Sequence, residues 1–484
     1  MKKIIAFIGV TLFPVLVAGQ MSFDAGTYVR FKTVNHRITA PQNWEEESSG
    51  LYKLSGSEIL DLGILTESSS NQSLEIRCRL EGNLSPQNSA SEPMGNDFSI
   101  PYHIFDSDTI IDDATEFWFY IPPSYNHSYD PILGKSSYVS NPYSDRKYFL
   151  VSGGNTAYQS IPLEAVAEQD SSRALNARVT WVYDTAMYNL VGTGRKWMGE
   201  LFDFTTTRVY DFRNRTTSST STANRPVPGS SIKVQIKAVA RSSTSNTKLT
   251  VQYGSQSETV IFPAVQTGSA SNYVQEKLLT VDFTADQSTT LTLSYDKVGN
   301  NAAAMWLDEM IVDWETSEEE VYPNQNMVNH PRGAGNYSHF EVEGSSCLRI
   351  FGIENQQIST RIEPAVVNSL GPDLARSKWY SHEDQPRAYR IGDCDAPLVH
   401  IVDEKVNLSY IQTATISDLN GIESIIITTD SLLDAANDLS ELERASGVTS
   451  EVVSLSYIYD VMNTGNPDIG AIRKFLVKAY ADYN

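Results

Sequence analysis

The sequence predicts a mostly β protein, built from β-sandwich or jelly-roll-like modules and followed by the first part of an α/β domain. Two observations predict this fold. Short apolar runs with the alternation of β-strands, separated by Ser, Asn, Pro and Gly, fill most of the chain up to about residue 400. After Asn407 the pattern changes to a continuous β-branched run, an amphipathic helix, a second strand and two further helices. This β-α-β-α-α order indicates a parallel sheet.

The first 19 residues predict a signal peptide. A positively charged start precedes an apolar run over residues 4–17, and Ala18 and Gly19 are small residues suited to signal-peptidase cleavage. The run is short for a membrane span, and no later stretch approaches the ~20 apolar residues that a span needs. We therefore expect an exported chain that does not span the membrane, with a mature form that starts near Gln20.

Length and charge limit the classes of partner. The 484 residues suffice for about three domains of the usual size. The formal net charge of -22 argues against nucleic acid or anionic lipid as a partner, because both carry negative charge themselves. No cofactor motif or metal-ligand spacing occurs along the chain, so we expect neither a cofactor nor a metal.

Three β regions precede the α/β segment. Residues 20–200 are a β-rich N-terminal region, and residues 321–405 are a connecting region of strands and loops. Residues 201–320 predict a β-sandwich or jelly-roll-like module, because six short strands follow one another between turns. In the first of them, apolar residues at 232, 234, 236 and 238 alternate with polar residues, as in a half-buried strand. The six strand-like runs are 230–241, 248–254, 258–263, 274–283, 289–296 and 304–315.

The module contains residues that could form a binding site. Sandwiches of this kind often bind sugars, and Trp306 or Trp314 could stack on a sugar ring, although packing in the core or at a domain seam is the stronger interpretation. Asp308 and the run Glu318–Glu320 could attract a cation, but a solvated strand end and linker explain them better.

Histidines and cysteines of the β regions do not form a recognisable site. His339, His382 and His400 lack metal-ligand spacing, and we interpret each as structural. An exported chain with an odd, small number of cysteines has no disulfide framework. A Cys347–Cys394 bridge and unpaired buried thiols both remain open. The three cysteines of the chain are Cys78, Cys347 and Cys394.

Residues 406–484 predict the first part of an α/β domain. The run 421–430 predicts a strand buried on both faces. Asp430 or Ser431 is expected to cap the next helix, and Gly447 suits its C′ position. A second strand is expected at 448–455. The apolar positions that share one face of the first helix are Leu432, Ala435, Ala436, Leu439 and Leu442.

The last nineteen residues predict an amphipathic helix, with Asn466 as N-cap, Pro467 at the first position and Asp468 in the first turn. Nothing in the 484 residues follows to bury its wide apolar face, and two parallel strands are not a domain. We therefore expect an incomplete domain whose next element would be a third strand. The apolar face comprises Ala471, Ile472, Phe475, Leu476, Ala479, Tyr480 and Tyr483.

The segment "IIITTDSLLDAANDLSELERASGVTSEVVSLSYIYDVMNTGNPDIGAIRKFL" resembles the start of the peptidase domain of gingipain-family cysteine peptidases, and within them the sortases of the type IX secretion system. The most telling part is Gly465–Asp468 followed by Ala471–Leu476. The resemblance covers about 60 residues in order. The region at 306–314 is a looser match, and the first 200 residues are similar only in being exported and β-rich.

The resemblance implies a caspase-like α/β fold and a cysteine endopeptidase with a His–Cys dyad at the outer membrane and cell surface of Gram-negative, Bacteroidetes-type bacteria. Such a sortase removes C-terminal sorting domains from secreted cargo proteins, links the cargo to a lipopolysaccharide anchor, and works with an outer-membrane secretion partner. In the family both catalytic residues follow later strands, beyond Asn484 here. Cys347 and Cys394 match no catalytic motif, so no catalytic, cofactor-binding or metal residue is assigned and the chain alone is expected to be inactive.

Two polar residues of the matched segment invite a functional role. Asp468 has a sufficient structural explanation as a first-turn carboxylate, and Arg473 could pair with a neighbouring helix. Two other interpretations compete with the peptidase: a secreted β-sandwich binding module, and a structural surface protein without peptidase activity. The apolar last helix favours the peptidase, because a module that ends naturally should end on a polar surface.

Overall fold

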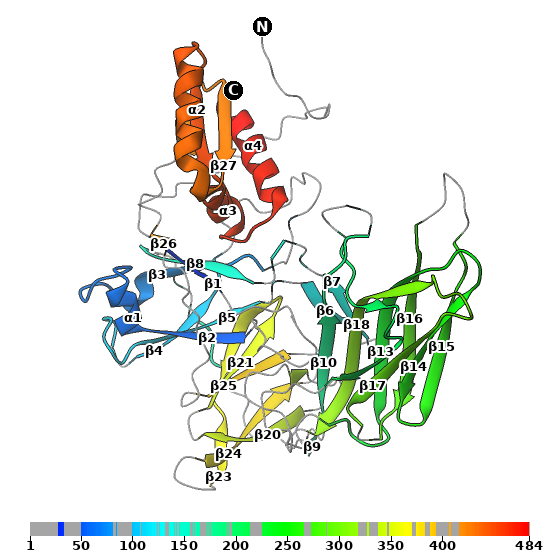
Figure 1. Cartoon of the computed structure of the whole chain (residues 1–484). Helices are drawn as coiled ribbons and strands as arrows, with labels where there is room; N and C mark the ends of the chain where they lie inside the picture. The colour runs from blue at the N-terminus through cyan, green and yellow to red at the C-terminus, as the bar shows by residue number, and fades with distance from the viewer. Residues whose placement is uncertain are drawn as a thin grey trace.

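The computed structural model confirms a mostly β protein that ends in a short α/β unit (Figure 1). Below, "α/β unit" denotes residues 416–483. The signal-peptide segment lies outside the described residues. The structure describes residues 28–32, 50–80, 84, 99–106, 108–122, 124, 126–130, 135–139, 141, 143–144, 146–154, 158, 160–164, 172–173, 176–190, 192, 196–212, 225–265, 273–286, 288–317, 327–328, 337–345, 348–369, 374–382, 388–393, 406–407 and 416–483.

Two small antiparallel sheets form the N-terminal β region. They share one hydrophobic core, in which the rings of Phe31 and Phe149 stack with centroids 5.2 Å apart and Phe119 packs edge-on to Phe149 at 5.6 Å. A capping box between Ser55 and Glu58 starts a helix between them. The elements are β1 (Tyr28–Lys32), β3 (Leu74–Arg77), β8 (Tyr148–Gly153) and β26 (Val406–Asn407) in one sheet, β2 (Gly50–Ser55), β4 (Tyr102–Phe105) and β5 (Glu116–Ile121) in the other, with α1 (Gly56–Asp61) and η1 (Asn71–Ser73).

The jelly-roll module consists of two sheets packed face to face, and its first sheet also contains β10 (Asn176–Asp184), which precedes the range 201–320 expected for the module. Its core is lined from both sheets, with Ile232 and Val234 on one side and Leu249 and Leu293 on the other, all fully buried. The first sheet contains β10 together with β11 (Leu201–Phe202), β13 (Ser231–Arg241), β16 (Gln275–Thr284) and β18 (Ala304–Ser317). The second contains β12 (Thr207–Asp211), β14 (Thr247–Tyr253), β15 (Gln256–Phe262) and β17 (Thr290–Asp296).

One face of β13 departs from the predicted half-exposed strand. Gln235 is buried, because a hairpin covers this side of the sheet, and its amide donates a 2.7 Å hydrogen bond to the carbonyl of Ser136. The carboxylate of Asp313 accepts 2.6 Å bonds from the hydroxyls of Ser136 and Thr180. The hairpin consists of β6 (Asn126–Asp130) and β7 (Lys135–Val139).

The large sheet continues from the jelly-roll module into the connecting region. Strand β10 pairs with β18 along its whole length and meets β19, which leads to further antiparallel strands. A separate four-stranded sheet lies beside them. The strands of the large sheet here are β19 (Met327–Val328), β21 (Leu348–Glu354), β22 (Gln357–Ile362) and β25 (Ala388–Asp393), and those of the small sheet are β9 (Ser172–Arg173), β20 (Tyr337–Ser345), β23 (Ala365–Ser369) and β24 (Leu374–His382).

The α/β unit has the predicted order, with two parallel strands and three helices. In Figure 1 it stands above the N-terminal β region, with α3 nearest the β sheets. Its elements are η5 (Ile416–Leu419), β27 (Ser424–Thr428), η6 (Asp430–Leu432), α2 (Leu433–Ala445), β28 (Ser450–Ser454), α3 (Leu455–Asn463) and α4 (Ile469–Tyr483).

Several local predictions for this unit are corrected. The chain enters the first helix through a 3₁₀ turn with Thr429 at its N-cap, so neither Asp430 nor Ser431 is the cap, whereas Gly447 has the expected positive φ of 86°. Strand β27 is half-buried along most of its length rather than buried on both faces, and within the described residues β28 is its only partner strand. Helix α4 starts at Ile469, two residues after the predicted first position.

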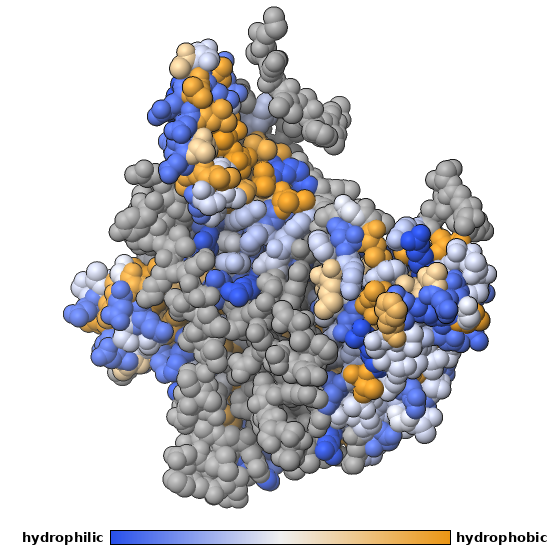
Figure 2. Space-filling view, viewed as in Figure 1, coloured by the Kyte–Doolittle hydropathy of each residue, from blue (hydrophilic) through white to orange (hydrophobic). Residues whose placement is uncertain are grey.

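The apolar stripes of α2 and α4 are only partly buried. Ala436 of α2 and Phe475 of α4 face the interior, but other apolar side chains of the same helices lie at the surface. Figure 2 shows apolar side chains gathered over this unit. Those with more than a third of their surface exposed are Leu432, Leu439, Leu442, Ile469, Leu476, Val477 and Tyr480. Within the described part of the chain, no helix combines the length and the hydropathy of a membrane span.

Candidate active-site edge of the α/β unit

The carboxyl ends of the two parallel strands form one edge of the α/β unit. Parallel α/β sheets bind ligands at this edge, because the loops there converge. Asp430 follows β27, and its two carboxylate oxygens accept hydrogen bonds from the hydroxyls of Ser454 at 2.5 Å and Ser456 at 2.6 Å. The hydroxyl of Ser454 also caps α3 by accepting from the backbone N–H of Tyr457 at 3.3 Å. Asp430 therefore ties the loop after β27 to the start of α3.

A buried ion pair connects this edge to the N-terminal β region. Asp460 of α3 is 1% exposed, and its carboxylate lies 3.1 Å from the guanidinium of Arg30 on β1. Burial raises the pKa of the Asp460 carboxyl to about 7, although the charge and hydrogen bond of Arg30 favour the ionised form; the negative charge of Asp430 adds to the rise. The sequence alone did not single out this pair.

The segment 464–468, which carries the family resemblance, is the main contact between the two regions. Thr464 ends α3 in the left-handed conformation with φ of 50°, and its hydroxyl accepts from the backbone N–H of Arg79 at 3.0 Å. Gly465 follows with φ of 86°, and a Cβ there would lie 2.8 Å from Cδ of Arg30. Glycine is needed at this position for both reasons.

The amide and carboxylate of this segment bind the backbone of the β region. Asn466 accepts from the N–H of Tyr148 at 2.9 Å and donates to its carbonyl at 3.1 Å, so it does not cap α4 as predicted. Asp468 accepts from the N–H of Leu84 at 2.8 Å and from that of Gly470 at 2.7 Å. Asp468 therefore takes the capping role predicted for Asn466, and its structural interpretation is confirmed. Arg473 lies half-buried on α4.

Tryptophans and Asp308 of the jelly-roll module are structural. Trp314 is 1% exposed and its ring lies 5.0 Å from that of Phe212, and Trp306 is buried in a small cluster at the edge of the module. Core packing of both is therefore confirmed. Asp308 is buried in the middle of β18, 3.0 Å from the ammonium of Lys237, so the prediction of a solvated strand end is wrong. Among the described residues no group of His, Cys, Asp and Glu could hold a metal.

The described thiol cannot act as a nucleophile. Cys78 is fully buried, its sulfur faces the carbonyls of Arg79 and Tyr148, and burial raises its pKa to about 11. His339 packs against the ring of Tyr380. His382 ends β24, but its side chain is not described. The other residues considered from the sequence lie outside the described residues: Glu318–Glu320, Cys347, Cys394 and His400.

Comparisons with known proteins agree with this geometry. The crystal structure of dimeric latent PorU from Porphyromonas gingivalis matches with a TM-score of 0.66 at 16% identity, covering 94% of this chain and 40% of that one. The chain thus spans less than half the length of PorU. The structure of infectious bursal disease virus Gt strain aligns over 76% of this chain and 64% of that one at 12% identity, but its TM-score of 0.17 supports no argument. No curated protein sequence matches the chain.

The C-terminal segment carries a family signature of its own. Residues 417–484 match Peptidase family C25, the gingipain family, over the α/β unit described above. The resemblance found in the sequence is therefore confirmed. Residues 417–484 are similar to Peptidase family C25, and the chain as a whole has a fold similar to that of part of PorU.

Proposed function

We propose that these 484 residues are the N-terminal portion of an exported sortase-type cysteine endopeptidase of the type IX secretion system. Its substrates are secreted cargo proteins with C-terminal sorting domains, and it works at the outer membrane beside a secretion partner. The observation that carries the proposal is the family match over residues 417–484, which coincides with an α/β unit fixed on a PorU-like β region.

Peptide-bond cleavage by such an enzyme needs two groups. A thiolate attacks the scissile carbonyl carbon to form an acyl-enzyme, and a histidine transfers the proton to the leaving amine. Cys78 does not meet this requirement, because it is buried and bound to two carbonyls. We place the catalytic His and Cys in the part of the peptidase fold that the 484 residues do not span, after later strands and at the same edge as Asp430.

The β region has a supporting role in this proposal. Four side chains hold the α/β unit on the β region at its carboxyl edge: Asp460 through Arg30, and Thr464, Asn466 and Asp468 through backbone groups. In this proposal, further elements of the peptidase fold cover the exposed leucines of α2 and the exposed apolar side chains of α4.

The test compares the 484-residue chain with a form extended by the downstream coding sequence to the length of PorU. A reporter fused to a C-terminal sorting domain is the substrate. We expect the extended form to cleave it, a thiol-alkylating reagent to stop cleavage, and the 484-residue chain to be inactive. Cys78→Ala in the extended form is the control and should keep the activity, because that thiol is buried.

Two results would contradict the proposal. Cleavage by the 484-residue chain would place the chemistry inside the present residues. A downstream sequence without a strand soon after Asn484, and without a His and a Cys after later strands, would remove the peptidase and leave a β module with an unexplained α/β unit.

A further inference from the structure

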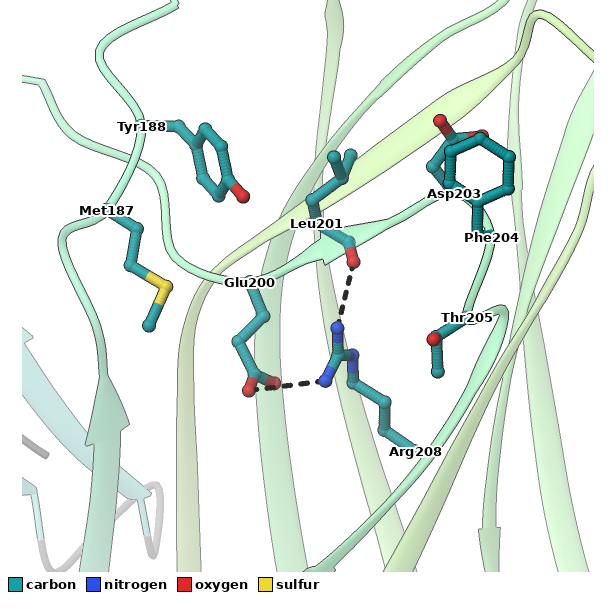
Figure 3. Close-up of a pocket in the computed structure, with 8 residues that line it drawn as sticks. All are labelled: Met187, Tyr188, Glu200, Leu201, Asp203, Phe204, Thr205 and Arg208. Carbon is teal, nitrogen blue, oxygen red and sulfur yellow. Dashed lines mark hydrogen bonds and ion pairs between the residues drawn. The ribbon is translucent and has the colours of Figure 1, made fainter. Parts of the chain in front are cut away.

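A pocket of about 370 Å³ opens on the jelly-roll module, far along the chain from the α/β unit. It lies where β11 ends and β12 begins, and residues 187–188 close one side of it (Figure 3). Its volume falls within the range of small-molecule sites. The lining residues are Met187, Tyr188, Glu200, Leu201, Asp203, Phe204, Thr205 and Arg208.

The interior of the pocket contains an ion pair whose side chains are held in place. Glu200 is 5% exposed, and its carboxylate accepts a 2.5 Å hydrogen bond from the hydroxyl of Tyr210 and lies 3.5 Å from the guanidinium of Arg208. Arg208 also donates to the carbonyl of Leu201 at 3.1 Å. Burial and the charge of Glu200 raise the pKa of Tyr210, so its hydroxyl remains a donor.

One donor in this interior has no partner. Nε of Arg208 is buried and makes no hydrogen bond within the described part of the chain. The guanidinium is fixed by Glu200, by the carbonyl of Leu201 and by the ring of Phe202 beneath it, 5.3 Å from the ring centroid. Because Nε itself is buried, a ligand in the pocket reaches only the exposed part of the Arg208 side chain, whose position these contacts fix.

The rim of the pocket is aromatic. The side chain of Phe204 is fully exposed, and Tyr188 is 40% exposed. Figure 3 shows their two rings on either side of Leu201, with Glu200 and Arg208 between and below them. Because the ring of Phe204 is fully exposed, both of its faces are accessible and a ligand in the pocket can stack on it.

The charges of the lining are balanced. Glu200 pairs with Arg208, and Asp203 pairs with Lys297. The lining therefore offers no unpaired charge to attract either an anionic or a cationic ligand. Exposed aromatic rings next to fixed carboxylate and guanidinium groups suit a neutral ring that carries hydroxyl groups, and jelly rolls are a common fold of lectin domains.

We propose that this pocket binds a neutral saccharide. One sugar face stacks on Phe204, and sugar hydroxyls donate to Glu200 and accept from the exposed part of the Arg208 guanidinium. The inference does not depend on the peptidase proposal, because the site lies in the jelly-roll module and needs no catalytic group. It also differs from the sequence-based idea of a sugar site, since Trp306 and Trp314 are buried.

The test uses residues 20–484 and a panel of glucose, galactose, mannose, N-acetylglucosamine and their neutral disaccharides. Saturation-transfer NMR and calorimetry should find at least one that binds with a Kd of about 0.1–10 mM, the range of a few contacts. Phe204→Ala should weaken this binding about tenfold or more. The matched control is Tyr480→Ala, which removes an exposed aromatic ring of α4 and should leave the affinity unchanged.

Arg208→Gln tests the polar interior and should also abolish binding. Because this change breaks the partly buried pair of Arg208 with Glu200, the thermal unfolding of the variant is measured as well. Thr205→Ala provides a milder second variant of the lining. The proposal is overturned if no neutral sugar binds at about 50 mM. It is equally overturned if Phe204→Ala and Thr205→Ala bind as the parent does, or if only charged sugars bind.

Discussion

The jelly-roll module and the α/β unit bury their apolar residues to very different extents. In the module, facing residues such as Ile232 and Leu249 are fully buried between two sheets. In the α/β unit, Leu439 and Leu442 of α2 are 48% and 68% exposed, and within the described residues β27 pairs with β28 only. The module thus encloses its apolar residues between its two sheets, whereas the unit leaves many of its apolar side chains at the surface.

The difference shows two ways of stabilising a region. The module depends on apolar burial between its own sheets, which contributes roughly 25 cal/mol per Å². The α/β unit is held by a small apolar core and by polar contacts to another region, namely the Arg30–Asp460 pair and the segment 464–468. Changes in the N-terminal β region should therefore destabilise the α/β unit but not the jelly-roll module.

Separation of the two regions should have the largest effect. Expressed alone, residues 406–484 should be poorly soluble or lack cooperative unfolding, because the contacts to β1 and β8 are lost and the helix faces remain exposed. Residues 176–317 should fold, since they retain both sheets including β10. Dye binding and thermal denaturation of the two fragments measure this. A sharp melt of monomeric 406–484 would contradict the comparison.

Within the module, Trp314→Ala should be the most destabilising single change. The side chain is 1% exposed in the core beside Phe212, and loss of such a residue costs about 3–5 kcal/mol. Phe204→Ala is the control: the residue is fully exposed, so the free energy of unfolding should change by less than about 0.5 kcal/mol. Denaturant unfolding of the two variants measures the difference, and equal effects would refute the assigned core.

Between the regions, Arg30→Met should loosen the α/β unit selectively. The change leaves the Asp460 carboxyl buried without its partner, at a cost of about 3 kcal/mol. Hydrogen exchange should then increase in α3 and at 464–468 but not in β13 or β18. The double variant with Asp460→Asn should recover much of the loss, because no buried charge remains. An equal increase in the jelly-roll strands would show that the regions are not separable.

Local patterns in the sequence were sufficient for most of the fold. Strict alternation predicted the strands of the module, and the β-branched run predicted β27 and its parallel partner. Alternation reports which side a residue faces but not what covers it. This is why Gln235 and Asp308 were expected in solvent, although a hairpin covers the first and Lys237 pairs with the second.

The segment 464–468 could be recognised from the sequence, but its contact partners could not be predicted. Gly465–Asp468 carried the family resemblance, yet the partners of this segment lie hundreds of positions away: Arg30 and Asp460 are 430 residues apart. No periodicity encodes such a pair. The capping role moved from Asn466 to Asp468 because the amide of Asn466 is taken by Tyr148. Glu200 and Arg208 could not be recognised from the sequence, since their pocket forms only where residues 187–188 meet residues 200–208 in the fold.

The smallest expected effect is a pH dependence centred on Asp460. Its pKa is raised from 3.8 to about 7 in the folded chain. The folded state therefore holds a proton that the unfolded state has lost, and the stabilisation declines as pH rises through about 7. Between about pH 6 and about pH 8 the unit should lose about 1 kcal/mol. Hydrogen exchange of α3 over this range measures the effect.

A second buried carboxyl makes the control necessary. Burial raises the pKa of Glu309 on β18 to about 7 as well, so the module should respond to pH in the same direction. Asp460→Asn should remove the pH dependence of exchange in α3 while that of β18 persists, and Glu309→Gln should do the reverse. If the two regions are independent, Asp460→Asn should not change the pH dependence of hydrogen exchange in β18. Such a change would show that the α/β unit and the jelly-roll module are coupled, despite their separate cores.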